Sequence, residues 1–490
     1  MMRSFVNQVG LKGAGFFVNV AIILVLGFLL SSPCLAPGRT DIAKLLAAAL
    51  LSAGLVYLLF RAGPKLNWTV CLTSLIALAA IESVFRLASH DPSSGQDPVR
   101  VPRPYVVFGG KPDARFPDKA PMTAPGEQAE PIHLNHLGFR FEKSLPLAKP
   151  EGQKRVFVLG GSTVFNGNPE SKTIPSLLEQ RFHQDGFTHV QVYNFGSVSF
   201  VSGQELALLT HTLLDYRPDV VIVYDGGNDM MSPFFYDPRP DHPYNYRVFE
   251  QAYEQLSGRP QESVSFLASL LLHSRAVRVL FGRDLQNLIV SFRQLRERQD
   301  YGSDAWEQLV VDRYIANIRK MAGMAKGFDF RFIAILQPLV HFKNPRMGRE
   351  ESLLGSEEFQ GYLVGQYSRA REHLADLRNE ESFQTSCLFL DLSGIMNGHN
   401  EETYWDFIHT DNRGNEYIAG QIYSRIRDWV TKQTSGGGMT AVGRAGDETT
   451  DQLQSPGGQF HLDEDTCAPA SGSSNSPITS RVKISRAPVR

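Results

Sequence analysis

Four short segments, far apart in the chain, carry residue types that together suit acyl transfer. They supply Ser162, Gly196, Asn228 and the pair Asp406 and His409. A serine hydroxyl becomes a good nucleophile when an imidazole takes its proton, and the imidazole needs an acceptor at its other nitrogen. The tetrahedral intermediate that follows needs hydrogen-bond donors for its oxyanion. The pattern predicts a serine nucleophile, a His–Asp pair that activates it, and an oxyanion hole.

Each of these segments follows a stretch that is predicted to be a β-strand. The predicted strands are residues 156–159, 189–195, 219–225, 330–337 and 387–393. Amphipathic segments lie between them, and strands that alternate with helices favour a parallel sheet. The carboxyl ends of parallel strands meet at one edge of the sheet, where α/β proteins place their sites. We therefore expect an α/β fold that brings the reactive residues together.

Taken alone, the turn "GGST" that carries Ser162 is compatible with several kinds of local structure. Gly160 and Gly161 suit any tight strand-to-helix connection, and Ser162 suits a helix cap. A phosphate-binding loop is disfavoured because the Walker spacing and its lysine are missing, and no dinucleotide fingerprint is present. The elbow of α/β-hydrolases is also incomplete, because Val164 stands where its last glycine belongs.

The four segments together resemble the SGNH (GDSL-like) hydrolase family, whose signature residues are Ser, Gly, Asn and His in this order. The matching stretches are "GGST", "NFG", "GGND" and "DFIH", within about residues 136–432. The resemblance implies a three-layer α/β/α fold with a five-stranded parallel sheet of flavodoxin-like order. It implies that Ser162 is the nucleophile, His409 the base and Asp406 its orienting partner. It further implies that Gly196 and Asn228, with the N–H of Ser162, stabilise the oxyanion.

Two positions depart from the family pattern. The usual Asp before the nucleophile is Gly161 here, as in membrane-anchored members with an "LGGST" turn. A second glycine often follows the glycine block by three positions, and here that residue is Ser199. Neither change removes a catalytic group. Because of both changes, the family pattern does not predict the shape of the substrate cleft.

Residues 1–90 read as a membrane anchor. Two uncharged apolar runs cover residues 15–32 and 45–60, and a third apolar run, residues 68–88, holds Glu82 and Arg86 four positions apart. The alternatives are a single span or, for the first run, a cleaved signal peptide, although no A-x-A site follows it. In a three-span chain, Arg3, Lys12, Arg61 and Lys65 lie on one side of the membrane and Arg39, Lys44 and Arg86 near the other. The positive-inside rule then predicts that everything after residue 90 is extracytoplasmic.

The rest of the chain divides by composition. Residues 91–135 read as a Pro-rich linker that packs onto the next domain, and residues 136–433 as the hydrolase domain with a helical insertion at about 232–325. Residues 434–490 have too few apolar groups for a core and are predicted to be disordered.

Charge and cysteine usage exclude several classes of function. The 49 Lys and Arg residues nearly balance the 51 Asp and Glu residues, and no basic stripe indicates a nucleic-acid partner. The four cysteines have no metal-ligand spacing: Cys34, Cys71, Cys387 and Cys467. We expect no metal and no cofactor, and the sequence indicates no oligomeric state.

These observations predict a membrane-anchored serine esterase that removes acyl groups, O-acetyl groups above all, from a cell-surface or exported glycan. Five aromatic residues near the predicted cleft are candidates to stack on sugar rings or simply to pack the insertion: Phe234, Phe235, Tyr236, Tyr404 and Trp405. Two alternatives stay open at this point, an O-acetyltransferase with the same triad and a non-catalytic scaffold for glycan export. An intact triad argues against the scaffold, since a binding module has no need of one.

Overall fold

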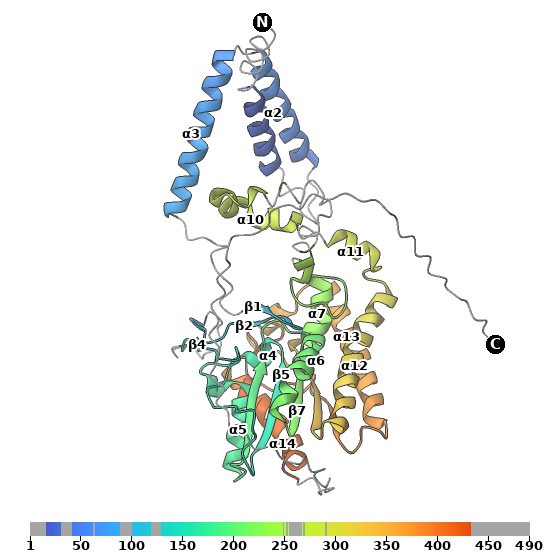
Figure 1. The fold of residues 1–490 in the computed structure, drawn as a ribbon. Helices are drawn as coiled ribbons and strands as arrows, with labels where there is room; N and C mark the ends of the chain where they lie inside the picture. Colours follow the sequence, from blue (N-terminus) through green and yellow to red (C-terminus); the bar gives the residue numbers. More distant parts are fainter. Residues whose placement is uncertain are drawn as a thin grey trace, which may run out of the picture. The chain divides into compact units, whose positions relative to one another are not determined.

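The computed structural model of the chain is shown in Figure 1. It describes residues 16–30, 42–61, 64–88, 100–118, 129–247, 249–250, 253, 267, 270–289 and 292–432. The predicted disordered tail, residues 434–490, lies outside the described residues.

A five-stranded parallel sheet forms the centre of the fold. Its strands are β5 (Lys154–Gly160), β6 (Val190–Gly196), β7 (Val220–Asp225), β8 (Arg331–Leu336) and β9 (Cys387–Asp391). Their spatial order is β6-β5-β7-β8-β9, and every pairing is parallel. The predicted parallel sheet with alternating helices is therefore confirmed. The two ends of each predicted strand lie within two residues of the ends of an observed strand.

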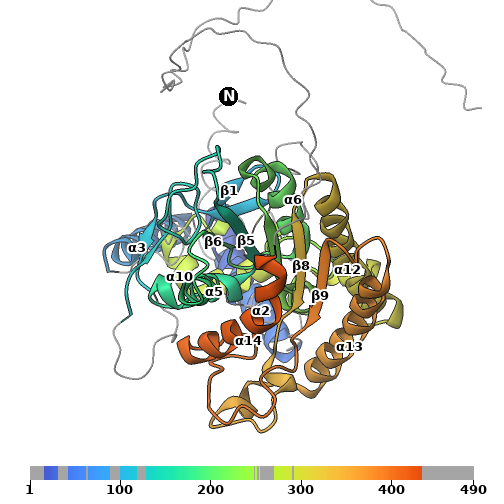
Figure 2. The ribbon, with the colours of Figure 1, turned by 90° about the horizontal axis from the view of Figure 1, so that it is seen from below.

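Helices cover both faces of this sheet (Figure 2). The pair α5 (Ile174–Gln184) and α14 (Asn412–Thr431) packs together on one face. The other face carries α6 (Ser202–His211), α12 (Asp304–Gly327) and α13 (Glu357–Asn379). Strand β5 shows why the sheet needs two covers: Val156 and Val158 belong to one buried cluster, whereas Phe157 and Leu159 belong to the other. Alternate side chains of a strand point to opposite faces, so each face has its own apolar core.

Shorter elements connect these layers. The short helices are α4 (Ser162–Phe165), α7 (Gly227–Phe235), α10 (Arg275–Ile289) and α11 (Arg293–Arg298). Single 3-10 turns cover Glu170–Lys172, Leu213–Tyr216, Val340–Phe342 and Glu350–Leu353. Most of the predicted insertion, including α10 and α11, lies between α7 and α12. Helix α12 itself is a crossover helix on the sheet, with Trp306, Tyr314 and Ile318 in the core.

Part of the predicted linker is folded onto the α/β domain. Strands β1 (Arg100–Arg103) and β2 (Val107–Gly110) pair antiparallel, as do β3 (Arg115–Phe116) and β4 (Ile132–His133). Phe108 joins the main core cluster, and the Gln204 amide donates a 2.7 Å hydrogen bond to the Val106 carbonyl. The few apolar residues of this proline-rich stretch thus pack against the domain.

The amino-terminal helices are the helix Phe16–Leu30, α2 (Ile42–Arg61) and α3 (Pro64–Ala88). Among the described residues, Lys65–Leu87 forms the one helix long and apolar enough to cross a membrane, and Phe16–Leu30 and Ala43–Leu59 are shorter apolar helices. The Asn19 amide donates to the Asn67 carbonyl at 2.8 Å, and the Asn67 amide donates to the Leu59 carbonyl at 3.1 Å. These bonds join the starts of the first and third helices to the end of the second. The first and third helices therefore run in the same direction, and α2 runs against them.

Candidate active site

Ser162 is the first residue of α4 and directly follows the end of β5. The two glycines before it allow a close approach of neighbouring chain segments. A Cβ on Gly160 would lie 2.5 Å from the Tyr224 carbonyl oxygen of β7, and one on Gly161 would lie 2.3 Å from Asn228 Nδ2. No side chain fits at such distances, so glycine at both positions lets β7 and the Asn228 amide pack against the serine turn.

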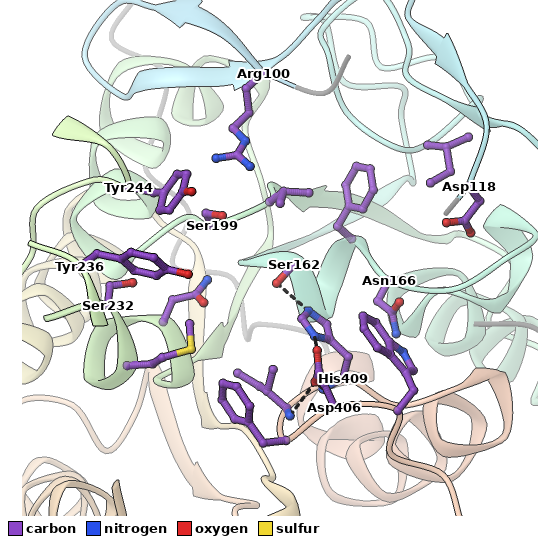
Figure 3. Close-up of a pocket in the computed structure, with 18 of the residues that line it drawn as sticks. Arg100, Asp118, Ser162, Asn166, Ser199, Ser232, Tyr236, Tyr244, Asp406 and His409 are labelled. Atoms are coloured by element: carbon purple, nitrogen blue, oxygen red, sulfur yellow. Dashed lines mark hydrogen bonds and ion pairs between the residues drawn. The ribbon is translucent and has the colours of Figure 1, made fainter. Parts of the chain in front are cut away.

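Ser162, His409 and Asp406 form a continuous hydrogen-bonded chain (Figure 3). His409 Nε2 is 2.7 Å from Ser162 Oγ, and His409 Nδ1 is 2.7 Å from Asp406 Oδ2. The second oxygen of Asp406 accepts the backbone N–H groups of Ile408 at 2.9 Å and His409 at 2.7 Å. The carboxylate thus fixes both the imidazole and the backbone that carries it.

The Asp–His pair lies in a loop. This loop follows β9 and is closed by an isolated bridge between Tyr404 and Thr410, just before α14. Asp406 reaches His409 because its side chain folds back over its own loop, as aspartates do in turns.

Hydrogen bonding keeps Asp406 ionised. Burial alone would raise the pKa of this carboxyl group, but the hydrogen bond and charge of His409, with the two backbone N–H groups, lower the pKa below its ordinary value of 3.8. An ionised acceptor at Nδ1 is what a serine–histidine pair needs in order to hold one imidazole tautomer.

Trp405 covers the imidazole of His409. The two ring centroids are 4.8 Å apart and the ring planes differ by 11°. The indole therefore packs nearly face to face against the imidazole and restricts the orientation of the ring. Sequence reasoning placed Trp405 only among candidate sugar-stacking residues, and nothing in its spacing indicated a contact with the base.

Three hydrogen-bond donors belong to residues that line the cavity. They are the N–H of Ser162, the amide of Asn228 and the N–H of Ser199, and all three residues line the same cavity. The side-chain amide of Asn228 donates one N–H to the Phe200 carbonyl at 2.7 Å. This bond orients the amide, and its second N–H is left to donate to a ligand in the cavity. In the part of the chain that the structure describes, the backbone N–H groups of Ser162 and Ser199 have no acceptor.

The structure gives Gly196 a packing role in place of the expected oxyanion contact. Its N–H donates to Asn194 Oδ1 at 2.9 Å, and Gly196 is not among the residues that line the cavity. A Cβ at this position would lie 2.6 Å from the Phe165 nitrogen, so glycine here lets β6 pack against α4. Ser199 lines the cavity, and its backbone has φ of 66°, in the left-handed region. Ser199, the position where the sequence departs from the family pattern, lines the cavity where Gly196 does not.

The aspartate of the "GGND" segment is structural. Asp229 is buried and accepts the Ser202 hydroxyl at 2.6 Å and the Ser202 N–H at 3.1 Å, which joins the start of α7 to the start of α6. Burial, with the nearby charge of Asp225, raises the pKa of Asp229 well above its ordinary value. This carboxyl group has no contact with the Ser162–His409 pair.

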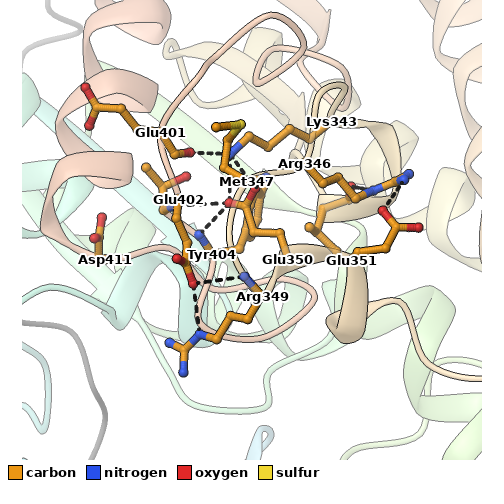
Figure 4. A network of polar contacts seen from close by, with 12 residues as sticks. Lys343, Arg346, Met347, Arg349, Glu350, Glu351, Glu401, Glu402, Tyr404 and Asp411 are labelled. Atoms are coloured by element: carbon orange, nitrogen blue, oxygen red, sulfur yellow. Dashed lines mark hydrogen bonds and ion pairs between the residues drawn. The ribbon is translucent and has the colours of Figure 1, made fainter.

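A buried ion pair holds the loop that carries Asp406 and His409 (Figure 4). Lys343 and Glu350 are both fully buried, and Lys343 Nζ lies 2.7 and 2.6 Å from the two carboxylate oxygens. Glu350 also accepts the backbone N–H groups of Thr403 at 3.0 Å and Tyr404 at 3.1 Å. The pair therefore ties the segment after β8 to the two residues before Trp405. No pattern in the sequence indicated this pair.

The triad opens onto a cavity of about 720 Å³. Apolar and aromatic side chains form most of its wall, and Arg100 and Asp118 are charged residues at its edge that come from the stretch predicted to be a linker (Figure 3). Of the five aromatic candidates, Tyr236 and Trp405 line the cavity. The other three do not: Phe234 and Phe235 contact Phe359, and Tyr404 is buried behind the loop. Across the described ranges, no group of three His, Cys, Asp or Glu residues is placed to hold a metal ion.

The chain was compared with known protein families, curated proteins and solved structures, and only solved structures are similar to it. No family model matches the chain, and no curated protein matches it. Similar solved structures include an acetyl xylan esterase with 13% identity, covering 56% of this chain and 99% of that chain at a TM-score of 0.31. An acetylxylan esterase from Geobacillus stearothermophilus has 10% identity, coverage of 57% and 97%, and a TM-score of 0.32. A putative lipolytic protein of the G-D-S-L family from Desulfitobacterium hafniense has 14% identity, coverage of 56% and 99%, and a TM-score of 0.29. Similarity at these sequence identities and TM-scores does not indicate which reaction the chain catalyses.

Replacing Asp406 with asparagine tests the arrangement of the triad. In Asp406→Asn the amide keeps the shape of the side chain, but its oxygen no longer carries the charge that holds Nδ1–H, so the imidazole adopts the wrong tautomer. We expect kcat for a small acetyl ester to fall by about 10⁴-fold with little change in KM. Steady-state kinetics measure this, and a thermal unfolding scan controls for folding. A kcat close to that of the unmodified protein would contradict the assignment.

Replacing Glu350 tests the buried pair. Glu350→Gln leaves the ammonium group of Lys343 buried beside a neutral amide, and removing one partner of a buried pair costs about 3–5 kcal/mol. We expect a loss of unfolding free energy of this size in urea titrations. The matched control is Glu351→Gln, because the Glu351 side chain is 71% exposed and pairs only at the surface with Arg346. That control should change stability by no more than about 0.5 kcal/mol. Equal effects in the two variants would refute the role of the pair.

Proposed function

We propose that this chain is a membrane-anchored serine esterase that hydrolyses acyl esters through an acyl-enzyme. The observation that carries the proposal is the unbroken chain Asp406–His409–Ser162, with 2.7 Å at both contacts between side chains, at the wall of an open cavity. A nucleophile within hydrogen-bond reach of a base that a third group orients is the arrangement that acyl transfer requires.

The mechanism follows from the positions of these groups. His409 Nε2 takes the Ser162 proton while Oγ forms a bond to the ester carbonyl carbon. The N–H groups of Ser162 and Ser199 and the Asn228 amide then stabilise the oxyanion. The imidazolium gives its proton to the leaving alcohol oxygen as the C–O bond breaks, which leaves an ester on Ser162. In the second half, His409 deprotonates a water that attacks this ester, and the imidazolium returns the proton to Ser162 Oγ as the bond between Oγ and the acyl carbon breaks and the acid is released.

The same residues support membership of the SGNH family. The nucleophile, the asparagine and the Asp–His pair occupy the places that the four-segment resemblance implies. The glycine block is satisfied differently: Gly196 provides close packing, and the second oxyanion donor comes from Ser199. A backbone N–H needs no particular side chain, so a serine that adopts positive φ serves here.

An acetylated glycan is the substrate class that we assign to the cavity. Its volume far exceeds an acetyl group, so most of it is left for the alcohol part of the ester. Tyr236, Tyr244 and Trp405 line the cavity and offer flat apolar surfaces with polar edges, which suit sugar rings. Acetate release from acetylated glycans tests both the carbohydrate and the acetyl group.

The anchor is assigned to three spans. Helix α3 has the length and composition of a span, and the parallel first helix and antiparallel α2 give the up-down-up order that three spans need. The apolar segments Phe16–Leu30 and Ala43–Leu59 are shorter than the usual span of about 20 residues. Such lengths suit a thin or locally compressed bilayer. Three spans place the catalytic domain outside the cytoplasm.

A fluorophosphonate probe tests the nucleophile. We expect labelling at Ser162, and loss of both labelling and acetyl-ester hydrolysis in Ser162→Ala, because removing one member of a triad costs several powers of ten in rate. The matched control is Ser171→Ala, at an exposed turn, which should label normally. Mass spectrometry of the labelled peptide identifies the serine, and labelling elsewhere would overturn the assignment.

Acetate release from a panel of acetylated glycans, with and without acceptor sugars, defines the reaction. Acetate as the product in both conditions supports hydrolysis, whereas acetyl transfer to an acceptor would replace the esterase with an O-acetyltransferase that uses the same acyl-enzyme. A folded protein without either activity and without probe labelling would favour the scaffold.

Reporter fusions test the topology. An enzyme that is active only outside the cytoplasm should be active when it is fused after residue 95, because three spans precede it. The same reporter fused after residue 62, between α2 and α3, should be silent, and a reporter that is active only in the cytoplasm should give the opposite pair of signals. A cytoplasmic signal at residue 95 would overturn both the topology and an exported glycan as substrate.

A further inference from the structure

Helix α10, in the long insertion, begins on a carboxylate of the proposed membrane-spanning helix α3. Glu82 accepts the backbone N–H groups of Arg275 at 2.8 Å and Ala276 at 3.0 Å, and the Ser274 hydroxyl at 2.7 Å. The first N–H groups of a helix have no partner within the helix, and a negative charge at that end is favourable. Glu82 therefore caps α10 from another part of the chain, 192 to 194 positions away.

The same helix packs against the first amino-terminal helix. Leu285 of α10 and Leu29 are buried in one apolar cluster, at 0% and 5% exposure. Val25 and Phe28 join the cluster from the first helix, and Val277 and Phe281 join it from α10. Val277, Phe281 and Leu285 follow each other at intervals of four, so one stripe of α10 makes this contact. The contact and the Glu82 cap together join α10 to two of the three apolar helices.

Both contacts lie near the carboxyl ends of helices that run in parallel. Leu29 is one residue from the end of Phe16–Leu30, and Glu82 is six residues from the end of α3. Six residues of α-helix span about 9 Å, so α10 lies beside the last part of α3 and not beyond it. That last part still exposes Val84 (60%) and Leu87 (90%). The headgroup layer on each side of a hydrocarbon core is only about 5–8 Å thick, so a helix at this level meets lipid.

On these grounds we propose that α10 is an interfacial helix, which lies in the headgroup layer of the bilayer at the face where α3 leaves it. The occupant of its uncovered surface is phospholipid. The proposal rests on the membrane anchor of the proposed function. Leu280 (59% exposed), Val279 (36%) and, just before the helix, Leu270 (56%) lie away from the buried stripe and provide the apolar contact.

The charge of α10 fits anionic lipid. The helix sequence "RAVRVLFGRDLQNLI" holds three arginines and one aspartate. Amphipathic helices of this composition bind at membrane surfaces through buried apolar area and attraction to anionic headgroups. Glu82 then has a reason to occur in an apolar helix: it caps α10 at the interface, where a carboxylate that accepts from Ser274, Arg275, Ala276 and Arg86 is tolerated.

The insertion therefore has a second attachment to the membrane in addition to the spans. Helix α7, which carries Asn228, precedes α10 in the chain, and α12 follows it. A catalytic domain held only through residues 89–99 would have one tether, whereas α10 gives it another on the far side of α7 in sequence.

Photo-crosslinking of the full chain tests the proposal. The photoreactive residue p-benzoylphenylalanine replaces one leucine at a time, in protein reconstituted into nanodiscs of phosphatidylcholine and phosphatidylglycerol. The positions are Leu280 on α10, Leu75 at the middle of α3 (47% exposed) and Leu309 on α12 (36% exposed). After irradiation, mass spectrometry scores lipid adducts on each peptide. We expect adducts at positions 280 and 75 and none at position 309.

The outcomes separate the two proposals. Adducts at position 75 without adducts at position 280 would overturn the interfacial helix and leave the anchor intact. Absence of adducts at both positions would overturn the anchor itself, and with it the interfacial helix. Adducts at position 309 equal to those at position 280 would show unspecific contact with lipid and would also overturn the proposal.

A second variant tests the cap. Glu82→Ala removes the acceptor of the first N–H groups of α10, so the amides of Arg275 and Ala276 should exchange hydrogen faster in the reconstituted protein. We expect at least a tenfold increase, which corresponds to about 1.4 kcal/mol of local stability. The matched control is Ser83→Ala, because the Ser83 hydroxyl bonds only to the Ala79 carbonyl of its own helix. Unchanged exchange in Glu82→Ala would contradict the capping role, and with it the placement of α10 at the level of Glu82.

Discussion

The hydrogen bond between His409 Nε2 and Ser162 Oγ is the contact on which the rest of the structure depends. It joins residues that are 247 positions apart and must hold them at 2.7 Å. The sheet solves half of this problem, because Ser162 lies just after the end of β5 and Asn228 just after the end of the neighbouring strand β7. The glycines at positions 160 and 161 bring these two strand ends to a separation that any side chain would prevent. Once the serine is fixed in this way, the remaining task is to bring the histidine to it.

The histidine lies in a loop, so its position depends on polar contacts instead of a strand ladder. Carboxylates that accept backbone N–H groups supply these contacts. Glu350 accepts the N–H groups of Thr403 and Tyr404 before the loop, and Asp406 accepts two within it. Each such bond removes a backbone group from competition with water and fixes a turn that regular structure does not. Lys343 makes the arrangement possible, because the Glu350 carboxylate without a buried cation would be too costly.

The sequence predicted most of the site because its chemistry is local to strand ends. Ser162 and Asn228 follow apolar runs that form neighbouring strands, and a parallel sheet brings such ends together whatever the intervening chain does. Asp406 and His409 lie further along, in the loop after β9, and their residue types and spacing indicated them. The role expected for Gly196 differs from its contacts for a physical reason. A glycine at the end of a strand can offer its N–H to a ligand or can allow close packing, and the sequence does not distinguish these roles. The bond from the Gly196 N–H to Asn194 does. Ser199 was visible in the sequence as a departure, but its positive φ was not.

What the sequence could not predict are contacts between segments that share no pattern. For residues 100–116 the sequence indicated packing on the domain but not which residues make it, and Phe108 and Val106 join the core. The Lys343–Glu350 pair and the Trp405–His409 stack are single contacts without periodicity. Glu82 belongs to the same class: in the sequence it pairs with Arg86 on its own helix, and in the structure it also caps a helix almost two hundred residues away.

The carboxylates of Glu350, Asp406 and Glu82 perform one physical task in three places. Each holds the start of an irregular or newly begun segment by accepting N–H groups that have no partner of their own. The first two lie behind the proposed nucleophile–base pair, and the third lies at the proposed membrane surface. In each place a carboxylate is retained although burial or an apolar setting opposes its charge, because the unpaired N–H groups would cost more. The same kind of contact that fixes His409 against Ser162 thus fixes α10 against α3, and it explains why acidic residues occur where hydropathy alone would exclude them.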